Sequence, residues 1–252
     1  MNSQSIGVGF VSGASLTLTR RCRHRCGYCS FRLQETGVPL LSLPQIETDL
    51  NAIVRMGITE VTFEAGEAPQ EFPEVVLALR ENGCESLGEY LTKVSAACLA
   101  RNLLPVFSLG EISPLEARQL AQSAAMQKIC VVAADLRAPG EAHEEARGRH
   151  PAAARHQIEI AHEAGLPYRL SFLIGIGEHH EERERAIVDF GRFCAADPLL
   201  QDVELHPFQP QSVTAMRGRP PLPFAAVAQA MSQLAKAFPV HCRSIAPHLF
   251  YH

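Results

Sequence analysis

Short apolar runs alternate with longer amphipathic stretches along the 252 residues of this chain. The apolar runs are rich in β-branched and aromatic residues and are bounded by glycine, proline and aspartate, a pattern typical of β-strands. They predict six strands, at 15–19, 60–66, 104–110, 128–135, 166–177 and 202–210, and a candidate seventh strand at 239–245.

The amphipathic stretches between these runs predict α-helices. The first, "SLPQIETDLNAIVRMG", has Ser42 as its N-cap, Pro44 in its first turn and Gly57 as its stop signal. Ser86 opens a later helix, with Glu89 at the spacing of a capping box. After the first helix, helices are predicted at about 72–82, 86–101, 114–125, 150–164, 180–195 and 222–237.

Apolar strands that alternate with helices indicate parallel βαβ units. The alternation continues through the chain without a low-complexity linker, so we expect one α/β domain over residues 1–252. A closed eightfold barrel typically takes about 250 residues, yet here the seventh predicted strand already lies near the end of the sequence. The pattern therefore predicts an open, partial (β/α)6-type, TIM-like barrel.

Composition narrows the partners of such a domain. A hydrophobic fraction of 46% lets the chain bury a sizeable core. The formal net charge is −4 with both signs interspersed, which favours small ligands over nucleic acid or an anionic membrane. Residues 1–18 do not resemble a signal peptide, and no apolar stretch approaches the roughly 20 residues of a membrane span. We therefore expect a cytoplasmic protein.

The eight cysteines are expected to be reduced in that compartment. Three of them, Cys22, Cys26 and Cys29, lie in the loop after the first strand, at the edge where parallel α/β proteins place their chemistry. The other five stand singly and are predicted to be buried as small hydrophobic residues: Cys84, Cys98, Cys130, Cys194 and Cys242.

Three thiolates this close in sequence can share a soft metal centre. A zinc site with His24 as a fourth ligand is one alternative, although structural zinc ligands usually come as two separated pairs. A 4Fe–4S cluster ordinarily takes four cysteines, so three would leave one iron open to a ligand from outside the protein. The arginines among the cysteines would favour the thiolate form: Arg20, Arg21, Arg23 and Arg25.

The CxxxCxxC spacing, with Tyr28 directly before the third cysteine, resembles the cluster loop of the radical S-adenosylmethionine (SAM) superfamily, here residues 20–32. The segments "CGYCSFR", "GEAPQ", "HPAAARHQIEIAHEAGLPY" and "FLIGIGE" resemble the 7,8-didemethyl-8-hydroxy-5-deazariboflavin synthase branch of that superfamily. The resemblance implies a radical SAM barrel whose three loop cysteines hold a 4Fe–4S cluster with SAM at the open iron. Reductive cleavage of SAM would give a 5′-deoxyadenosyl radical that abstracts hydrogen from a small molecule.

The same resemblance implies further contacts to SAM. They are a glycine–glutamate pair at the ammonium, an arginine at the carboxylate and a glycine turn beside the adenine. These positions are occupied by Gly66 and Glu67, by Arg155, and by Ile174, Gly175 and Gly177, with Tyr28 beside the cluster. The turn is not a dinucleotide fingerprint, because His180 stands where GxGxxG requires a glycine.

The chain departs from the branch at three places. A glutamate–serine pair near the SAM ribose is replaced by Ala133 and Ala134, with Asp135 as the candidate substitute. A substrate-facing arginine is replaced by Gln209, with His206 just upstream. The C-terminal segment that helps to close the family's barrel is expected to be absent, and a partner chain is one candidate replacement.

The resemblance further implies a substrate in which a tyrosine-derived phenol is joined to a ribityl-diaminouracil, and which cyclises to a deazaflavin after hydrogen abstraction. It also implies a reductant for the cluster, such as flavodoxin or ferredoxin. Two alternatives remain: a radical SAM enzyme of another small-molecule pathway, and a non-catalytic cluster- or zinc-binding relative. The residues expected to line the lumen are Phe63, Phe107, Phe172 and Phe208, with Ser108, His206 and Gln209 as polar anchors.

Overall fold

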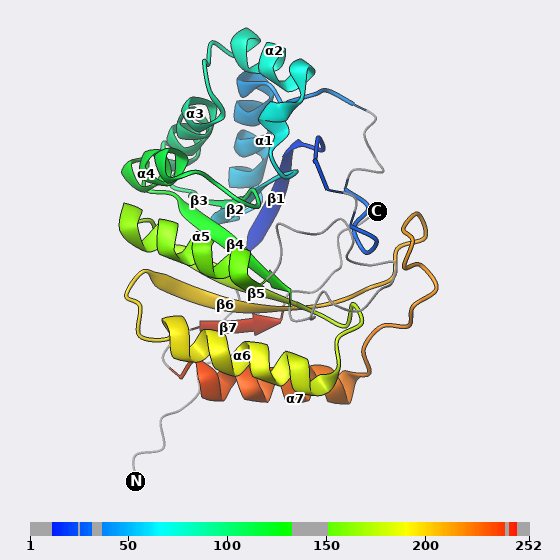
Figure 1. Ribbon diagram of the computed structural model, residues 1–252. Helices are drawn as coiled ribbons and strands as arrows, with labels where there is room; N and C mark the ends of the chain where they lie inside the picture. Colours follow the sequence, from blue (N-terminus) through cyan, green and yellow to red (C-terminus); the bar gives the residue numbers. More distant parts are fainter. Residues whose placement is uncertain (1–11, 25, 32–36, 133–150, 240–241, 246–252) are drawn as a thin grey trace.

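The computed structural model describes residues 12–24, 26–31, 37–132, 151–239 and 242–245, the last of these by its backbone only. Strands and helices alternate along it, as the sequence pattern predicts (Figure 1). The strands are β1 (Gly13–Thr19), β2 (Glu60–Ala65), β3 (Leu104–Ser108), β4 (Met126–Val132), β5 (Tyr168–Ile174), β6 (Leu200–Pro207) and β7 (Cys242–Ile245). The helices are α1 (Leu43–Arg55), α2 (Pro73–Glu81), α3 (Leu87–Leu99), α4 (Pro114–Gln122), α5 (Pro151–Ala164), α6 (His180–Cys194) and α7 (Phe224–Ala237), with a 3-10 turn, η2 (Pro69–Glu71).

The seven strands form one parallel sheet in the order β1 to β7, which confirms the open α/β arrangement and the candidate seventh strand. Arg169 of β5 reaches Glu60 of β2 with 2.8 Å between Nη1 and Oε1, although two strands lie between them. In a flat sheet those strands would be roughly 14 Å apart. The sheet is therefore curved, and both side chains lie on its concave face, which we call the lumen.

The helices pack on the outer face of this sheet (Figure 1). Ser42 caps α1 by accepting the Gln45 N–H at 3.3 Å. Ser86 caps α3 in the same way, but the Glu89 carboxylate accepts from the Glu85 N–H at 2.9 Å. The predicted capping box of α3 is thus displaced by one residue.

Three of the four phenylalanines expected in the lumen lie in the core instead. Phe172 packs against Phe190 of α6 with ring centroids 5.9 Å apart, and Phe63 stacks on Phe107 at 5.3 Å. All are essentially fully buried. Successive residues of a strand face opposite sides of the sheet. Glu60 shares the lumen face with Arg169, and Phe63 is an odd number of residues further along β2, so Phe63 faces the helices. The structure therefore corrects the expectation that Phe63 faces a substrate.

The lumen itself is polar. Its lining follows from the strand register and from the contacts of Arg169. Cys130 shares this face with Lys128 and is only half-buried, so it is not the core residue that the sequence predicts. The polar residues of the lumen face are Ser15, Thr17, Glu60, Thr62, Glu64, Ser108, Lys128, Cys130, Arg169, Ser171, Asp202, Glu204 and His206.

The other isolated cysteines fit their prediction where they are described. Cys84, Cys98 and Cys194 are at most 2% exposed. Burial raises the pKa of Cys98 and of Cys194 to about 12, so both thiols are protonated and unreactive near neutral pH. The side chain of Cys242 lies outside the described residues.

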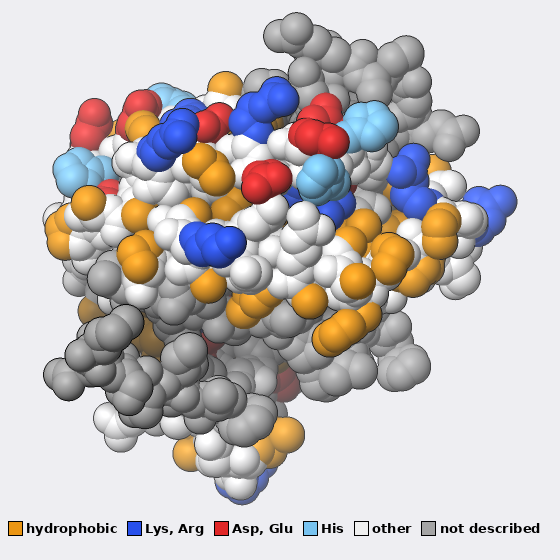
Figure 2. All heavy atoms as spheres, turned by 90° about the horizontal axis from the view of Figure 1, so that it is seen from below, with side chains coloured by type: hydrophobic (Ala, Val, Ile, Leu, Met, Phe, Trp, Pro, Cys, Tyr) orange, Lys and Arg blue, Asp and Glu red, His pale blue; other side chains and the backbone are white. Residues whose placement is uncertain are grey.

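The outer surface carries charges of both signs. On the face seen from below, acidic, basic and histidine side chains intermingle over the described part (Figure 2). No helix in the described ranges is long and apolar enough to cross a membrane.

Candidate functional site

The cysteine loop, residues 20–32, follows β1 and lies at the carboxyl edge of the sheet. Two backbone hydrogen bonds join the residues after β2 to the end of β1 and to this loop. The Arg23 N–H donates to the Glu67 carbonyl at 3.0 Å, and the Gly66 N–H donates to the Thr19 carbonyl at 3.2 Å. The predicted cluster loop and the predicted glycine–glutamate pair are thus brought together.

Gly66 allows this close approach. A Cβ atom at this position would lie 2.6 Å from the Arg21 carbonyl carbon and 2.6 Å from the Cys22 Cβ, and closer still to the Arg21 carbonyl oxygen. Two of these atoms belong to the backbone and cannot move without displacing the loop. Gly66 therefore has a structural role beside the first cysteine, in addition to the SAM contact that the resemblance implies.

The arginines of the loop serve as anchors. Arg21 pairs with Glu74 at the start of α2, with 2.8 Å between Nε and Oε1, and the Arg20 guanidinium lies 5.1 Å from the centre of the Phe31 ring. These contacts were not foreseen from the sequence, which suggested only an electrostatic role towards the thiolates. Arg23 lies within 3.6 Å of three carboxylates, those of Glu67, Glu71 and Glu111.

Glu67 is buried, with 4% of its surface exposed. Its carboxylate accepts the Glu111 N–H at 3.0 Å and packs against Gly110, where a Cβ atom would clash with it. The side chain thereby joins the end of β2 to the loop after β3. This holds Glu67 beside the cysteine loop, where the resemblance implies that it meets the SAM ammonium.

The three thiols lie half-buried in the loop. Cys22 Sγ accepts the Glu67 N–H at 3.2 Å, and Cys29 Sγ accepts the Phe31 N–H at 3.4 Å. Hydrogen bonds from backbone N–H groups stabilise the anionic form of sulfur, and such bonds tune iron–sulfur clusters. The Cys29 N–H also donates to the Cys26 carbonyl at 3.0 Å, which forms a turn between the second and third cysteines.

This donor set suits a cluster. No three His, Cys, Asp or Glu side chains converge on a single metal ion within the described ranges. A 4Fe–4S cluster makes a different demand, because each cysteine binds a different iron. Three half-buried thiols with two N–H donors directed at their sulfurs fit that demand.

The glycine turn after β5 is built by one buried ion pair. The Glu178 carboxylate accepts the N–H of Gly175 at 2.5 Å and the N–H of Ile176 at 2.9 Å. Arg183 of α6 then binds the same carboxylate, with Nε at 3.0 Å and Nη2 at 2.9 Å. Glu178 and Arg183 were not singled out from the sequence, although a Glu five residues before an Arg at a strand–helix junction is a usable signal.

The loop after β6 covers this turn. Gly175 has a φ of +89° and Gly177 a φ of +130°. A Cβ at Gly175 would lie 2.7 Å from Leu222 Cγ, and one at Gly177 would lie 2.9 Å from Arg219 Nη1. Both glycines therefore face protein in this structure, and the expected contact with an adenine would need the side chains of Leu222 and Arg219 to move.

Tyr28 belongs to a small apolar cluster, separate from the main core, at the carboxyl edge. It packs with Leu173 against four buried residues, Val132, Ile176, Phe208 and Met216, which come from four different segments. The Met216 N–H also donates to the Gly27 carbonyl at 3.0 Å. Of the phenylalanines expected near the site, Phe208 is the one that lies there, and Met216 is a member that the sequence reasoning missed.

Arg155 lies in the helix layer. Its guanidinium stacks over two rings of α6, 4.8 Å from the centre of Phe190 and 4.7 Å from that of Phe193. This contact joins α5 to α6. It gives no support to the role at the SAM carboxylate, which remains a prediction.

The remaining predicted residues are dispersed. Ile174 is fully buried in the main core at the end of β5. Ser108 is half-buried on the lumen face of β3, and Gln209 is exposed beyond β6. Asp135, with Ala133 and Ala134, lies outside the described residues.

His206 is joined to an ionic network in the lumen. Its Nε2 lies 2.8 Å from Glu204 Oε2, which is also 2.7 Å from Lys128 Nζ, and Glu204 Oε1 is 3.0 Å from Arg169 Nη1. Burial alone would raise the pKa of Glu204, but the bond from His206 and the two cations hold it well below its ordinary value. Glu204 is therefore ionised. The sequence reasoning found His206 and missed Lys128 and Glu204.

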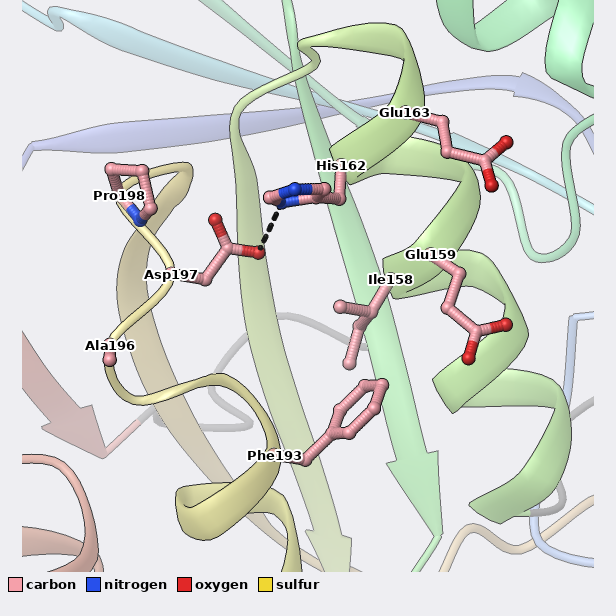
Figure 3. A pocket seen from close by; sticks show the side chains of 8 residues that line it. All are labelled: Ile158, Glu159, His162, Glu163, Phe193, Ala196, Asp197 and Pro198. Carbon is pink, nitrogen blue, oxygen red and sulfur yellow. Dashed lines mark hydrogen bonds and ion pairs between the residues drawn. The ribbon is translucent and has the colours of Figure 1, made fainter.

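A pocket of about 410 Å³ lies away from this edge, between α5 and the segment before β6 (Figure 3). Ile158 and Phe193 are among the residues that line it, and His162 Nδ1 lies 3.2 Å from Asp197 Oδ2. Asp197 also accepts the Tyr168 hydroxyl at 3.0 Å and the Leu199 N–H at 3.0 Å. These bonds give Asp197 a structural role, and we do not assign the active site to this pocket.

Solved structures show the same fold. The FeFe-hydrogenase maturase HydG from Carboxydothermus hydrogenoformans superposes with a TM-score of 0.68 at 16% identity, covering 92% of this chain and 52% of that one. Methylornithine synthase (PylB) gives a TM-score of 0.62 at 15% identity, covering 95% of this chain and 73% of that one.

Curated relatives are named 7,8-didemethyl-8-hydroxy-5-deazariboflavin synthase. That of Methanothermobacter thermautotrophicus is 32% identical over 195 residues, 77% of this chain and 60% of the relative. That of Archaeoglobus fulgidus is 30% identical over 216 residues, 85% of this chain and 64% of the relative. The chain thus spans less than two thirds of the length of these relatives.

The family model described as "Radical SAM superfamily" matches residues 16–190, from β1 into α6, and so includes the cysteine loop, the Gly66–Glu67 pair and the glycine turn. This range is more than half of the chain and agrees with the fold and with the donor set at its carboxyl edge. The chain belongs to the radical SAM superfamily.

Proposed function

We propose that this protein is a radical SAM enzyme that abstracts hydrogen from a small, uncharged substrate, in a reaction of the deazaflavin synthase type. The observation that supports this most is the meeting of the cysteine loop, the Gly66–Glu67 pair and the polar lumen at one edge of the sheet. When bound, a reduced 4Fe–4S cluster and SAM supply a 5′-deoxyadenosyl radical that takes a hydrogen atom from the substrate.

The protein's own residues have separable roles in this proposal. Cys22, Cys26 and Cys29 hold the cluster, with the N–H groups of Glu67 and Phe31 directed at two of their sulfurs. Further residues position and shield the site. Gly66 keeps the loop against β2, and the apolar cluster around Tyr28 excludes water from the space above the lumen.

The charges of the lumen favour an uncharged substrate. Among the described strand residues, four acidic side chains line it against two basic ones, and most of these groups are already paired with one another. An anionic substrate would meet the excess of carboxylates, whereas hydroxyl and amide groups can bond to the serines, threonines and His206. A phenol joined to a ribityl-diaminouracil offers such groups, and the relatives that are named deazaflavin synthases support this choice. The acidic residues are Glu60, Glu64, Asp202 and Glu204, and the basic residues are Lys128 and Arg169.

Two partners belong to the proposal. The cluster needs an electron donor such as flavodoxin or ferredoxin, because SAM cleavage consumes one electron. A second chain that closes the open side of the barrel beyond β7 is a further expectation. It would be seen as a complex that raises turnover.

The test is anaerobic reconstitution with iron and sulfide, followed by incubation with a reductant, SAM and the phenol–ribityldiaminouracil adduct. We expect 5′-deoxyadenosine and a fluorescent deazaflavin. Cys26→Ala should lose iron and both products, because one iron loses its anchor. Cys98→Ala is the matched control, since that thiol is buried in the core and its loss costs only packing.

Each product decides a different part of the proposal. 5′-Deoxyadenosine with a different substrate and no deazaflavin would keep the radical enzyme and reject the synthase. Full iron content and full activity in Cys26→Ala would reject the assignment of the cluster ligands.

A further inference from the structure

The pocket of about 410 Å³ between α5 and the segment before β6 is separate from the proposed reaction (Figure 3). His162 and Glu163 lie in the last turn of α5, and Pro198 lies just before β6. The pocket is thus near the end of the sheet where the parallel strands begin. The cysteine loop follows β1 at the other end of the strands, so the proposed reaction does not account for this pocket.

Half of the lining of the pocket is apolar. Ile158 is almost fully buried, but Phe193 keeps 40% of its surface exposed. The Arg155 guanidinium lies 4.7 Å from the centre of the Phe193 ring but is not among the lining residues. A ligand that covered the ring would remove further apolar surface from water. The apolar lining residues are Ile158, Phe193, Ala196 and Pro198.

The charged lining residues are acidic. Three carboxylates and the imidazole of His162 line the pocket, and no lysine or arginine is among the described residues that do so. Figure 3 shows Asp197 on one side of Ile158 and His162, and Glu159 and Glu163 on the other. The C-terminal end of α5 adds negative potential. The pocket therefore favours a cation.

One wall of the pocket is already fixed by hydrogen bonds. The Asp197 carboxylate, with 11% of the side chain exposed, accepts the Tyr168 hydroxyl and the Leu199 N–H, each at 3.0 Å. Burial raises the pKa of Tyr168, so its hydroxyl keeps the proton that it donates. His162 Nδ1 lies 3.2 Å from the same carboxylate. A preformed wall reduces the entropy that is lost when a ligand binds.

We propose that this pocket binds a small organic cation, a protonated amine joined to an aromatic or branched aliphatic body. The body covers Phe193 and Ile158, and the ammonium group lies on the side of Glu159 and Glu163. A neutral compound of the same shape gains only the apolar contact, and an anion is repelled by the carboxylates. The volume is within the range of small-molecule sites, about 300–1,000 Å³. This inference does not depend on the proposed function.

The first experiment titrates the reconstituted full chain at pH 8 with phenethylamine, phenethyl alcohol and phenylacetate, which are similar in shape but cationic, neutral and anionic. Carbon-13 NMR of the Ile158 methyl groups, assigned by the signals lost in Ile158→Val, reports binding at the pocket itself. We expect the amine to bind about fivefold or more tightly than the alcohol, and phenylacetate to cause no shift. Equal affinities of amine and alcohol, or no saturation by the amine at about 10 mM, would overturn the proposal.

The double variant Glu159→Gln/Glu163→Gln tests the charges. Both glutamates are exposed, so the variant should fold, and its affinity for phenethylamine should fall about fivefold or more while its affinity for the alcohol is unchanged. Glu47→Gln/Glu85→Gln is the matched control, because it removes two exposed carboxylates elsewhere. An unchanged affinity for the amine in the first double variant would refute the recognition of the cation.

Phe193→Ala tests the apolar part of the site. It should weaken the amine and the alcohol by the same factor, because both lose the contact with the ring. Phe224→Ala, which removes a phenylalanine that is 83% exposed at the start of α7, should change neither affinity. Unchanged binding in Phe193→Ala would contradict the proposal. None of these measurements requires turnover, so a failure of the proposed function leaves their outcome unaffected.

Discussion

At the residue scale, Gly66 couples the sheet to the cysteine loop. Gly66→Ala would bring a Cβ to within 2.6 Å of the Cys22 Cβ and against the Arg21 backbone. Overpacking against backbone costs about 1–3 kcal/mol, and here the displaced group is the first cysteine. We expect a lower iron content after reconstitution and a lower midpoint of thermal unfolding.

Gly13→Ala is the matched control for Gly66→Ala. Gly13 begins the neighbouring strand β1, and a Cβ there would meet only the Glu60 carbonyl oxygen at 3.8 Å, which is an ordinary contact. Iron content should be unchanged in this variant. Equal iron contents in both variants would show that Gly66 has no special role beside the loop.

At the element scale, the strand–turn–helix unit of β5 and α6 depends on Glu178. Glu178→Gln removes the charge that pairs with the buried Arg183 and replaces one of two acceptors by a donor. Breaking a buried ion pair from one side costs about 3–5 kcal/mol. We expect a loss of that size in the free energy of unfolding by urea.

The control for Glu178→Gln lies on α6, the helix that follows this turn. Glu184 is 49% exposed and 3.8 Å from His180, so Glu184→Gln should change the stability by less than about 1 kcal/mol. Similar stabilities of the two variants would mean that the turn holds its shape without its ion pair.

At the scale of the whole molecule, Arg169 joins strands across the lumen. Its guanidinium contacts Glu60 at 2.8 Å, Asp202 at 3.2 Å and Glu204 at 3.0 Å. Arg169→Met would leave these carboxylates buried without that cation, at a cost of about 3–5 kcal/mol near pH 7.5. The cost should shrink as the pH is lowered.

The direction of this pH dependence follows from the pKa values of the carboxyl groups that contact Arg169. Burial raises the pKa of Asp202, and the charge of Arg169 opposes that shift. Arg169 also lowers the pKa of Glu204. Without Arg169 both pKa values rise, so the folded variant binds more protons than the folded unmodified protein, and its deficit in stability grows as the pH rises.

Urea unfolding at pH 5.5 and 7.5 tests this prediction. The deficit of Arg169→Met relative to the unmodified protein should be larger at pH 7.5. Arg192→Met, which removes an arginine that is 79% exposed and paired with Asp189, should show no such pH dependence. A deficit that is equal at both pH values would contradict the ionic role of Arg169.

Much of the fold could be predicted because it depends on local signals. Caps such as Ser42 and the apolar runs of the strands act within a few residues, and helix and strand positions agree with them to within a few residues. The three cysteines of the loop were found for the same reason, since their spacing is itself local. The surroundings of Arg155 could not be predicted, because its sequence context does not reveal that two rings of α6 lie beside it.

The alternation of strands and helices, the cysteine spacing and the superfamily of the chain can all be read from the sequence. Which face of each strand lines the lumen could be seen only after folding. Folding turned Phe63 and Phe172 into the core and Cys130, Glu204 and His206 inward. A parallel strand has two faces that look alike in sequence when both are covered, and only the curvature of the sheet, which brings Arg169 of β5 to Glu60 of β2, distinguishes them.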